Sequence, residues 1–104
     1  PLAQPLKENP IMAFGPWIRN EREKAGISLK TFAHSIDISP AYWSRIERGL
    51  ELAPKDSLII GACEQLGLAT DRAFIEAARL PPDMQEDLAL AVSVYRDFKS
   101  RSSA

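Results

Sequence analysis

The segment ISPAYWSRIERG, residues 38–49, constrains the fold most strongly because it marks both ends of a short helix. Ser39 can accept a hydrogen bond from an early backbone N–H, and Pro40 suits the first helical position because its missing N–H is not needed there. Gly49 can adopt the left-handed conformation that ends many helices. The segment therefore predicts a helix that starts at Pro40 and ends just before Gly49.

This helix has two faces when successive residues are placed about 100° apart. One face is apolar and predicts contact with the core: Tyr42, Trp43 and Ile46, with Glu47 at its edge. The other face combines small residues with two guanidinium groups: Pro40, Ala41, Ser44, Arg45 and Arg48. A helix exposed only to water more often carries Glu, Lys and Gln, because these are strong helix formers. The second face therefore favours close approach to another molecule.

Capping residues and apolar spacing predict an all-α chain without strands or internal repeats. A first helix includes Phe14 and Ile18 and ends at Lys24, and a second follows the Ser28 cap. Only about three residues join the second and third helices, which is typical of a helix-turn-helix unit. The apolar residues expected between the helices are Ile27, Phe32, Ile36, Ile38, Trp43 and Ile46.

Three more helices are predicted in the second half of the chain. A fourth spans approximately residues 55–66, and a fifth begins at a Thr70 cap and ends before Pro81. A sixth runs from beyond Asp83 to near Phe98 and is followed by a frayed tail. We expect a flexible N-terminal segment at 1–12, of the kind left by processing or expression, a helix-turn-helix domain at 13–82 and a C-terminal helix at 83–104.

The sixth helix carries a heptad-like apolar stripe that needs a partner surface. Its members are Met84, Leu88, Ala91, Tyr95 and Phe98. A stripe this short is compatible with a helix that folds back over helices one and five. It is also compatible with a homodimer interface, which we favour because a second copy would add a second binding contact.

Cysteine and histidine usage argues against several kinds of site. A single Cys63 excludes a disulfide framework within the chain, and a single His34 leaves no cluster for a metal. We expect Cys63 to be a small buried residue and His34 to lie on the surface. No metal or cofactor is expected. The sequence shows neither a nucleophile beside a plausible base nor a glycine-rich phosphate loop, so it does not suggest an enzyme. Without a membrane-length apolar run or a signal pattern, a cytoplasmic location is expected.

The charge distribution is uneven although the net charge is only −1. Residues 13–48 contain six basic and four acidic residues, which gives +2, whereas residues 49–104 contain six basic and nine acidic residues, which gives −3. The mildly basic part of the chain is therefore the part that contains the predicted helix-turn-helix unit.

Three segments in this order resemble a known family: REKAGIS, FAHSIDIS and YWSRIERG. They are similar to the phage-repressor-like helix-turn-helix regulators, often called the XRE family, and the resemblance extends over residues 13–83. It implies a five-helix lambda-repressor-like bundle, here with an additional sixth helix. It also implies a bacterial, plasmid or phage regulator, most simply a repressor, whose third helix enters the DNA major groove and whose homodimers read a palindromic operator.

The resemblance also implies roles for individual residues. On the third helix, base and phosphate contacts correspond to Ser39, Pro40, Ala41, Ser44, Arg45 and Arg48. Phosphate contacts at the start of the second helix correspond to Ser28 and Lys30, and the Tyr42 hydroxyl can reach another phosphate. Arg22 occupies the position that pairs with Glu47 in the family, so we interpret this pair as structural.

Three positions depart from the family pattern: Leu29 replaces a glutamine, Asp37 replaces the turn glycine, and the loop after Gly49 reads Leu50-Glu51 rather than basic. These departures favour weaker phosphate binding. They leave open a second hypothesis, in which the same bundle is a protein-interaction module that binds a toxin or another regulator. The small-plus-arginine face of the third helix favours double-stranded DNA as the partner.

Overall fold

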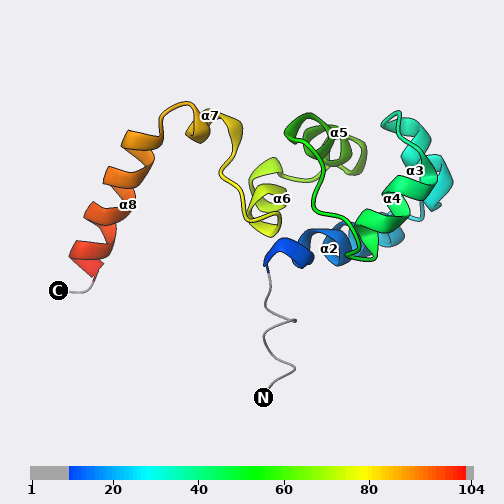
Figure 1. Ribbon diagram of the computed structural model, residues 1–104, viewed down its shortest axis with the longest axis horizontal. Helices are drawn as coiled ribbons and strands as arrows, with labels where there is room; N and C mark the ends of the chain where they lie inside the picture. The colour runs from blue at the N-terminus through cyan, green and yellow to red at the C-terminus, as the bar shows by residue number, and fades with distance from the viewer. Residues whose placement is uncertain (1–9, 103–104) are drawn as a thin grey trace, which may run out of the picture.

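The computed structural model describes residues 10–102, which form seven helices and no strand (Figure 1). Five of them form a bundle: α2 (Pro10–Lys24), α3 (Leu29–Ser35), α4 (Pro40–Glu47), α5 (Asp56–Leu66) and α6 (Thr70–Glu76). The other two, α7 (Pro82–Gln85) and α8 (Leu88–Ser102), are called the arm below. The all-α prediction is confirmed, and the predicted third helix is α4.

Two helix starts differ from the sequence prediction. Helix α2 begins at Pro10, before the expected start near Phe14, so residues 10–12 of the predicted N-terminal segment belong to this helix. Proline at the first helical position explains the early start. The rest of the predicted N-terminal segment lies outside the described residues. The cap of α6 is Ala69 rather than Thr70, and no side chain satisfies the first N–H groups of that helix.

The predicted sixth helix is interrupted. Glu86 and Asp87 form a turn between α7 and α8, and Asp87 Oδ1 accepts a hydrogen bond from the Leu90 backbone N–H at 3.2 Å. This side-chain cap starts a new helix. The new helix continues to Ser102, past the expected end near Phe98, and an ion pair of 3.1 Å between Arg101 and Asp97 spans its last turn. The expected frayed tail is therefore helical up to residue 102.

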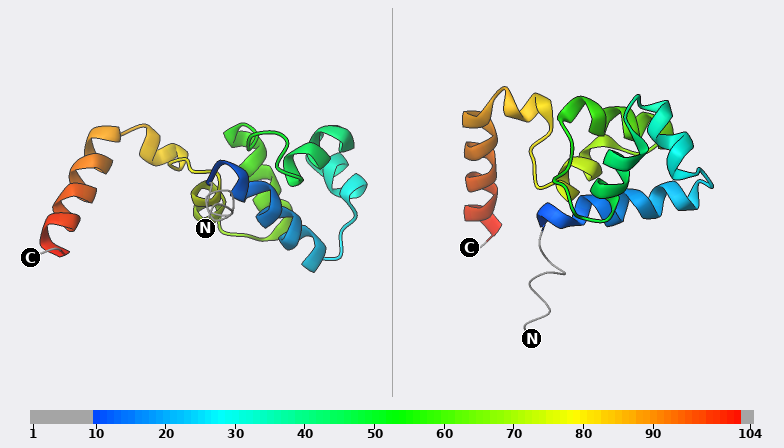
Figure 2. Two further views of the ribbon diagram at one scale, coloured as in Figure 1. Left: turned by 60° about the horizontal axis from the view of Figure 1, so that its bottom comes forward. Right: turned by 45° about the vertical axis from the view of Figure 1, so that its right-hand side comes forward.

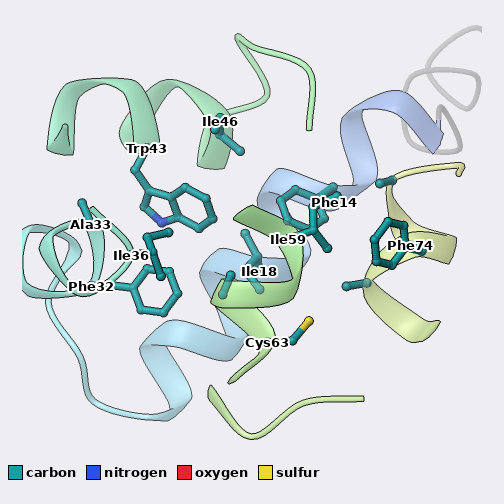
Figure 3. Close-up of a cluster of buried hydrophobic side chains, with 13 residues drawn as sticks. Phe14, Ile18, Phe32, Ala33, Ile36, Trp43, Ile46, Ile59, Cys63 and Phe74 are labelled. Carbon is teal, nitrogen blue, oxygen red and sulfur yellow. The ribbon is translucent and has the colours of Figure 1, made fainter. Parts of the chain in front are cut away.

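One aromatic cluster organises the core of the bundle (Figure 3). Trp43 on α4 is fully buried and meets Phe14 on α2 edge-on, with ring centroids 6.5 Å apart. Its other neighbour is Phe32 on α3, at 5.3 Å. Edge-to-face and tilted arrangements are favourable for aromatic rings. Three helices therefore meet around one indole, and the prediction that Trp43 and Ile46 belong to the core is confirmed.

The turn between α3 and α4 contains the Asp37 backbone in the left-handed conformation, with φ of 59°. Asp tolerates this conformation better than most residues because its short side chain can bond locally. Asp37 therefore adopts the left-handed conformation that this turn requires. Helix α3 packs against α4, and α2 packs against both α4 and α6.

A polar network links the bundle to the start of the arm. Arg79 donates from Nη2 to the Ala53 carbonyl at 2.6 Å and from Nη1 to Asp56 Oδ1 at 3.1 Å. Gln85 Nε2 donates to Asp56 Oδ2 at 3.1 Å and to the Leu80 carbonyl at 2.6 Å. Asp56, the first residue of α5, therefore contacts both Arg79, which follows α6, and Gln85 in α7. These side chains form the joint between the bundle and the arm.

Beyond this joint the arm leads away from the bundle, and α8 stands apart from the other helices except α7 in the different views (Figures 1 and 2). Leu88, Tyr95 and Phe98 are 53%, 61% and 66% exposed. The alternative in which the C-terminal helix folds back over the predicted first and fifth helices, α2 and α6, is therefore not adopted. Within residues 10–102, no helix combines the length and the apolar character needed to cross a bilayer.

Candidate nucleic-acid interface

Helix α4 is closed at both ends by the residues that the sequence indicates. The Ser39 side chain accepts a hydrogen bond from the Tyr42 backbone N–H at 3.1 Å, and Pro40 is the first helical residue. Gly49 has φ of 77°, and the Leu50 N–H then donates to the Arg45 carbonyl at 2.8 Å. The ends of this helix are thus determined by local hydrogen bonds, which keep it short and well defined.

The two faces of α4 lie as the wheel predicts. Trp43, Ile46 and Glu47 are buried, and Tyr42 is half-buried at the edge of the core. The outer face, defined as Pro40, Ala41, Ser44, Arg45 and Arg48, lies at the surface. Ala41 and Arg48 are exposed, and the other three are partly buried. The small residues at the start of this face allow close approach, and the arginines extend from its second half.

A buried polar network holds the inner face of α4. Arg22 donates from Nε and Nη2 to the two oxygens of Glu47, at 2.7 and 2.8 Å, and from Nη1 to the Ile27 carbonyl at 2.7 Å. Trp43 Nε1 donates to Glu47 Oε2 at 2.6 Å. Such a bidentate, charge-assisted pair is strong and directional. The hydrogen bond to Glu47 raises the pKa of Arg22 above its usual value, so the guanidinium stays charged.

This network shows more than the sequence predicts. Glu47 is placed at the edge of the apolar face by the wheel, yet only 3% of the residue is exposed. The pairing with Arg22 follows from the family resemblance, but the indole bond does not, because it depends on the rotamer of Trp43. The i, i+4 spacing of Trp43 and Glu47 is the only sequence signal that places the two on adjacent turns.

Helices α2 and α4 touch at backbone level through Gly15. A Cβ atom at this position would lie 2.0 Å from the Ile46 carbonyl oxygen and 3.1 Å from that of Glu47. Any side chain there would force the helices apart. Gly15 therefore sets how deeply α4 sits on α2, and it is a positioning residue that the sequence analysis missed.

The two arginines of the outer face have partners in the free protein. Arg45 Nε lies 3.3 Å from Glu51 Oε2, and its guanidinium carbon lies 5.9 Å from the centre of the Tyr42 ring. Arg48 Nε donates to the Ser44 carbonyl at 3.3 Å and to Ser44 Oγ at 3.2 Å. Glu51 therefore competes for the guanidinium of Arg45, a role that the sequence analysis did not assign because the two residues are not at helical spacing.

The start of α3 lies at the surface as well. The Ser28 side chain accepts a hydrogen bond from the Thr31 N–H at 3.1 Å, and both Ser28 and Lys30 are exposed. Leu29, which replaces the glutamine of the family pattern, packs against the core instead. His34 is exposed and Cys63 is buried, as expected.

The residues predicted for dimerisation lie on two helices rather than one. Met84 belongs to α7, whereas Leu88, Ala91, Tyr95 and Phe98 belong to α8. The large members are about half exposed or more, and Ala91 is partly buried. The stripe is therefore not one continuous helical seam, because the turn at 86–87 changes the direction of the chain.

Comparisons with known proteins agree with this geometry. A sequence model of the helix-turn-helix domain matches residues 13–77. Two crystal structures of the clp gene regulator ClgR from Corynebacterium glutamicum are similar to the chain. One is 32% identical, has a TM-score of 0.57 and covers 66% of this chain and 88% of ClgR. The other is 26% identical, has a TM-score of 0.59 and covers 89% of this chain and 88% of ClgR. No curated protein matches the chain.

Proposed function

The chain belongs to the helix-turn-helix domain family of non-enzymatic, DNA-binding transcription regulators, and on that premise we propose that it is a repressor that binds a palindromic operator as a homodimer. In this proposal α4 enters the major groove and α8 joins the two copies. The observation that carries the proposal is the outer face of α4, where small residues precede two arginines on a helix held rigidly from behind.

Each residue at this surface then has a role that follows from its chemistry. Arg45 presents a planar fork that can donate to guanine O6 and N7, and Arg48 lies one turn away near the phosphates. Ser39, Pro40 and Ala41 leave room for the groove wall, and Ser44 can donate to a base edge. Ser28, Lys30 and the Tyr42 hydroxyl contact phosphates and set the register of the helix.

The proposal for a homodimer is supported by the few base contacts that one eight-residue helix can make. A two-fold dimer would present two copies of α4 to half-sites about one helical turn apart, ~34–36 Å. The second contact would become intramolecular and raise affinity without new residues. The similarity to a clp gene regulator supports a role in controlling genes, and which genes these are is a question for genomic selection.

The decisive experiment selects DNA fragments bound by the full chain from the source genome and titrates binding to the recovered site against salt. A repressor of this kind should recover a palindrome and lose affinity steeply as salt rises, because phosphate contacts release counterions. If the chain instead shows a flat salt dependence and no preferred sequence, the protein-interaction module becomes the better hypothesis, and the proposal fails.

Arg45→Ala should relax specificity at one base pair in each half-site, because a good bidentate pair contributes about 1–3 kcal/mol of discrimination. Arg72→Ala is the matched control, since Arg72 is an exposed arginine on α6, remote from the proposed groove contact. The measurement is affinity for a panel of operators with single base changes. Unchanged specificity in Arg45→Ala would contradict the proposed docking of α4.

Lys30→Ala should weaken binding to all sequences alike and lower the salt slope by about one, because a phosphate contact carries no sequence information.

Glu51→Gln should instead raise the affinity for DNA about two- to fivefold, because it releases Arg45 from an exposed ion pair that is worth at most ~1 kcal/mol. Glu76→Gln removes the same charge from the ion pair with Arg72 and serves as its control. Equal gains in both glutamine variants would show a general charge effect rather than release of Arg45.

A further inference from the structure

The arm carries an apolar groove that the DNA-binding role does not use. It lies in the angle between α7 and α8 and has a volume of about 440 Å³. Its apolar lining consists of Leu80, Met84, Leu90, Ala91, Val94 and Tyr95. Two carboxylates, Asp83 and Asp87, complete the lining. A groove with an apolar floor and carboxylates beside it fits an apolar side chain that is flanked by cations.

The same chain presents such a side chain at the other end of α8. Phe98 is 66% exposed, the highest exposure among the large apolar residues of the arm. Lys99 follows it directly, and Arg101 lies one turn further on. Phe98 cannot fill the groove of its own chain, because it extends from the straight helix that forms one wall of that groove. The groove and the side chain that suits it can therefore meet only between two molecules.

Charge decides how two arms would be oriented. The start of the arm carries three acidic residues, Asp83, Glu86 and Asp87. The end carries three basic residues and one acidic residue, namely Arg96, Lys99, Arg101 and Asp97. Parallel arms would place carboxylates beside carboxylates, whereas antiparallel arms place each acidic start beside a basic end. Electrostatic complementarity of this kind determines register and orientation.

We propose that α8 pairs antiparallel with α8 of a second copy, so that Phe98 of the partner subunit enters the α7–α8 groove. This inference rests on the homodimer proposed above and specifies its interface. The two-fold axis passes near Ala91, midway between residues 84 and 98, and the contact forms twice because the interface is self-complementary. Seven large apolar side chains of the arm, each 46% to 66% exposed, supply the area: Met84, Leu88, Leu90, Val92, Val94, Tyr95 and Phe98. Patches larger than a few hundred Å² are rare on monomers and mark interaction sites.

Disulfide trapping in the full chain tests the orientation directly, because the native Cys63 is buried and burial raises the pKa of its thiol. The double variant Met84→Cys with Phe98→Cys, kept at a protein concentration well above its weakened dissociation constant, should cross-link into a dimer under mild oxidation. Each single variant should not, because two copies of residue 98, each seven residues along α8 from an axis near Ala91, lie about 20 Å apart, beyond disulfide reach, and two copies of residue 84 lie on opposite sides of the axis. Cross-linking of either single variant to itself would contradict the antiparallel arrangement while leaving the homodimer intact.

Charge reversal gives an independent readout by sedimentation equilibrium. Asp83→Lys should weaken the dimer roughly tenfold at low salt, because two symmetry-related contacts change sign. Adding Lys99→Glu on the same chain should restore most of the loss. A parallel arrangement predicts the reverse for the single change, since Asp83→Lys would then relieve repulsion. Circular dichroism establishes that each variant is folded.

Phe98→Ala should raise the dissociation constant of the dimer on the order of a hundredfold, as expected for a central aromatic contact. Ala89→Ser, on the polar side of α8, is the control and should leave dimerisation unchanged. A full chain that stays monomeric at all concentrations would overturn this inference and the homodimer together. Operator binding by such a monomer, lost in Arg45→Ala, would still support the DNA-binding role of α4.

Discussion

The five-helix bundle and the arm contain the same kinds of apolar residue in opposite environments. Phe14, Trp43 and Phe74 in the bundle are fully buried, whereas Tyr95 and Phe98 in the arm are 61% and 66% exposed. The difference lies in the number of neighbouring helices. A bundle helix such as α2 packs against both α4 and α6, while the main packing partner of α8 is the short helix α7. Burial is therefore a property of the arrangement, and the arm needs a partner that the bundle does not.

The polar groups also differ in burial: those of the bundle include a buried, hydrogen-bonded carboxylate, whereas the ion pair of the arm is exposed. In the bundle, the Glu47 carboxylate receives three hydrogen bonds from two side chains and is almost completely buried. No described side chain in the chain leaves a buried polar atom without a hydrogen bond. In the arm, the pair between Arg101 and Asp97 is exposed, and such pairs contribute little to stability. The bundle is complete as a monomer, and the following predictions test that statement against the arm.

The largest effect should come from paired aromatic truncations in the two regions. Trp43→Ala removes the centre of the core and one donor to Glu47, and it should lower the free energy of unfolding by about 3–5 kcal/mol. Tyr95→Ala, measured in dilute protein where the chain is monomeric, should change it by less than about 0.5 kcal/mol. Urea denaturation followed by circular dichroism measures both.

Similar losses from the two truncations would break the comparison, because they would mean that the arm is part of the monomer core. A stable Trp43→Ala protein that only fails to bind DNA would instead place the indole at the interface. Both outcomes are readily distinguished from the expected one, in which only the bundle variant loses stability.

Two glycine substitutions within the bundle should change its free energy of unfolding by intermediate amounts, and they test how closely its helices pack. Gly15→Ala should destabilise by about 1–3 kcal/mol, because the new methyl group would overlap the Ile46 carbonyl. Gly61→Ala should stabilise by about 0.5–1 kcal/mol, since Gly61 lies inside α5 and the nearest atom that a new Cβ would meet, Ile36 Cγ2, is 3.8 Å away. Thermal unfolding of the two variants should shift in opposite directions. The same sign for both would argue against a tight contact between α2 and α4.

A small effect, similar in size to that of Gly61→Ala, is expected at the boundary between the two regions. Ala78 follows α6 and has φ of 58°, a conformation that costs an L-residue about 1–2 kcal/mol. Ala78→Gly should therefore raise the free energy of unfolding by roughly 1 kcal/mol. Gly67→Ala is the inverse control, because Gly67 has φ of 66° and open space around its Cβ. If Ala78→Gly destabilises, the backbone at the joint is held by contacts that outweigh its strain.

Some features of this protein could be predicted because their causes are local. The ends of α4 follow from Ser39, Pro40 and Gly49, whose hydrogen bonds and backbone preferences act within one turn. The separation of its inner and outer faces follows from the helical repeat alone. The break at residues 86–87 is equally local, because Asp87 caps α8, but the apolar spacing on both sides of it predicts one continuous helix.

By itself, therefore, the sequence determined an all-helical chain, the limits and faces of α4, and the burial of Trp43. Only the tertiary structure decided how α2 and α4 approach through Gly15, how Glu47 is shared between Arg22 and Trp43, and that Arg45 meets Glu51 across a loop. It also decided that α8 points away from the bundle rather than over it. The physical reason is range: caps and periodicity depend on neighbours within a few residues, whereas contacts between helices depend on how the whole chain packs.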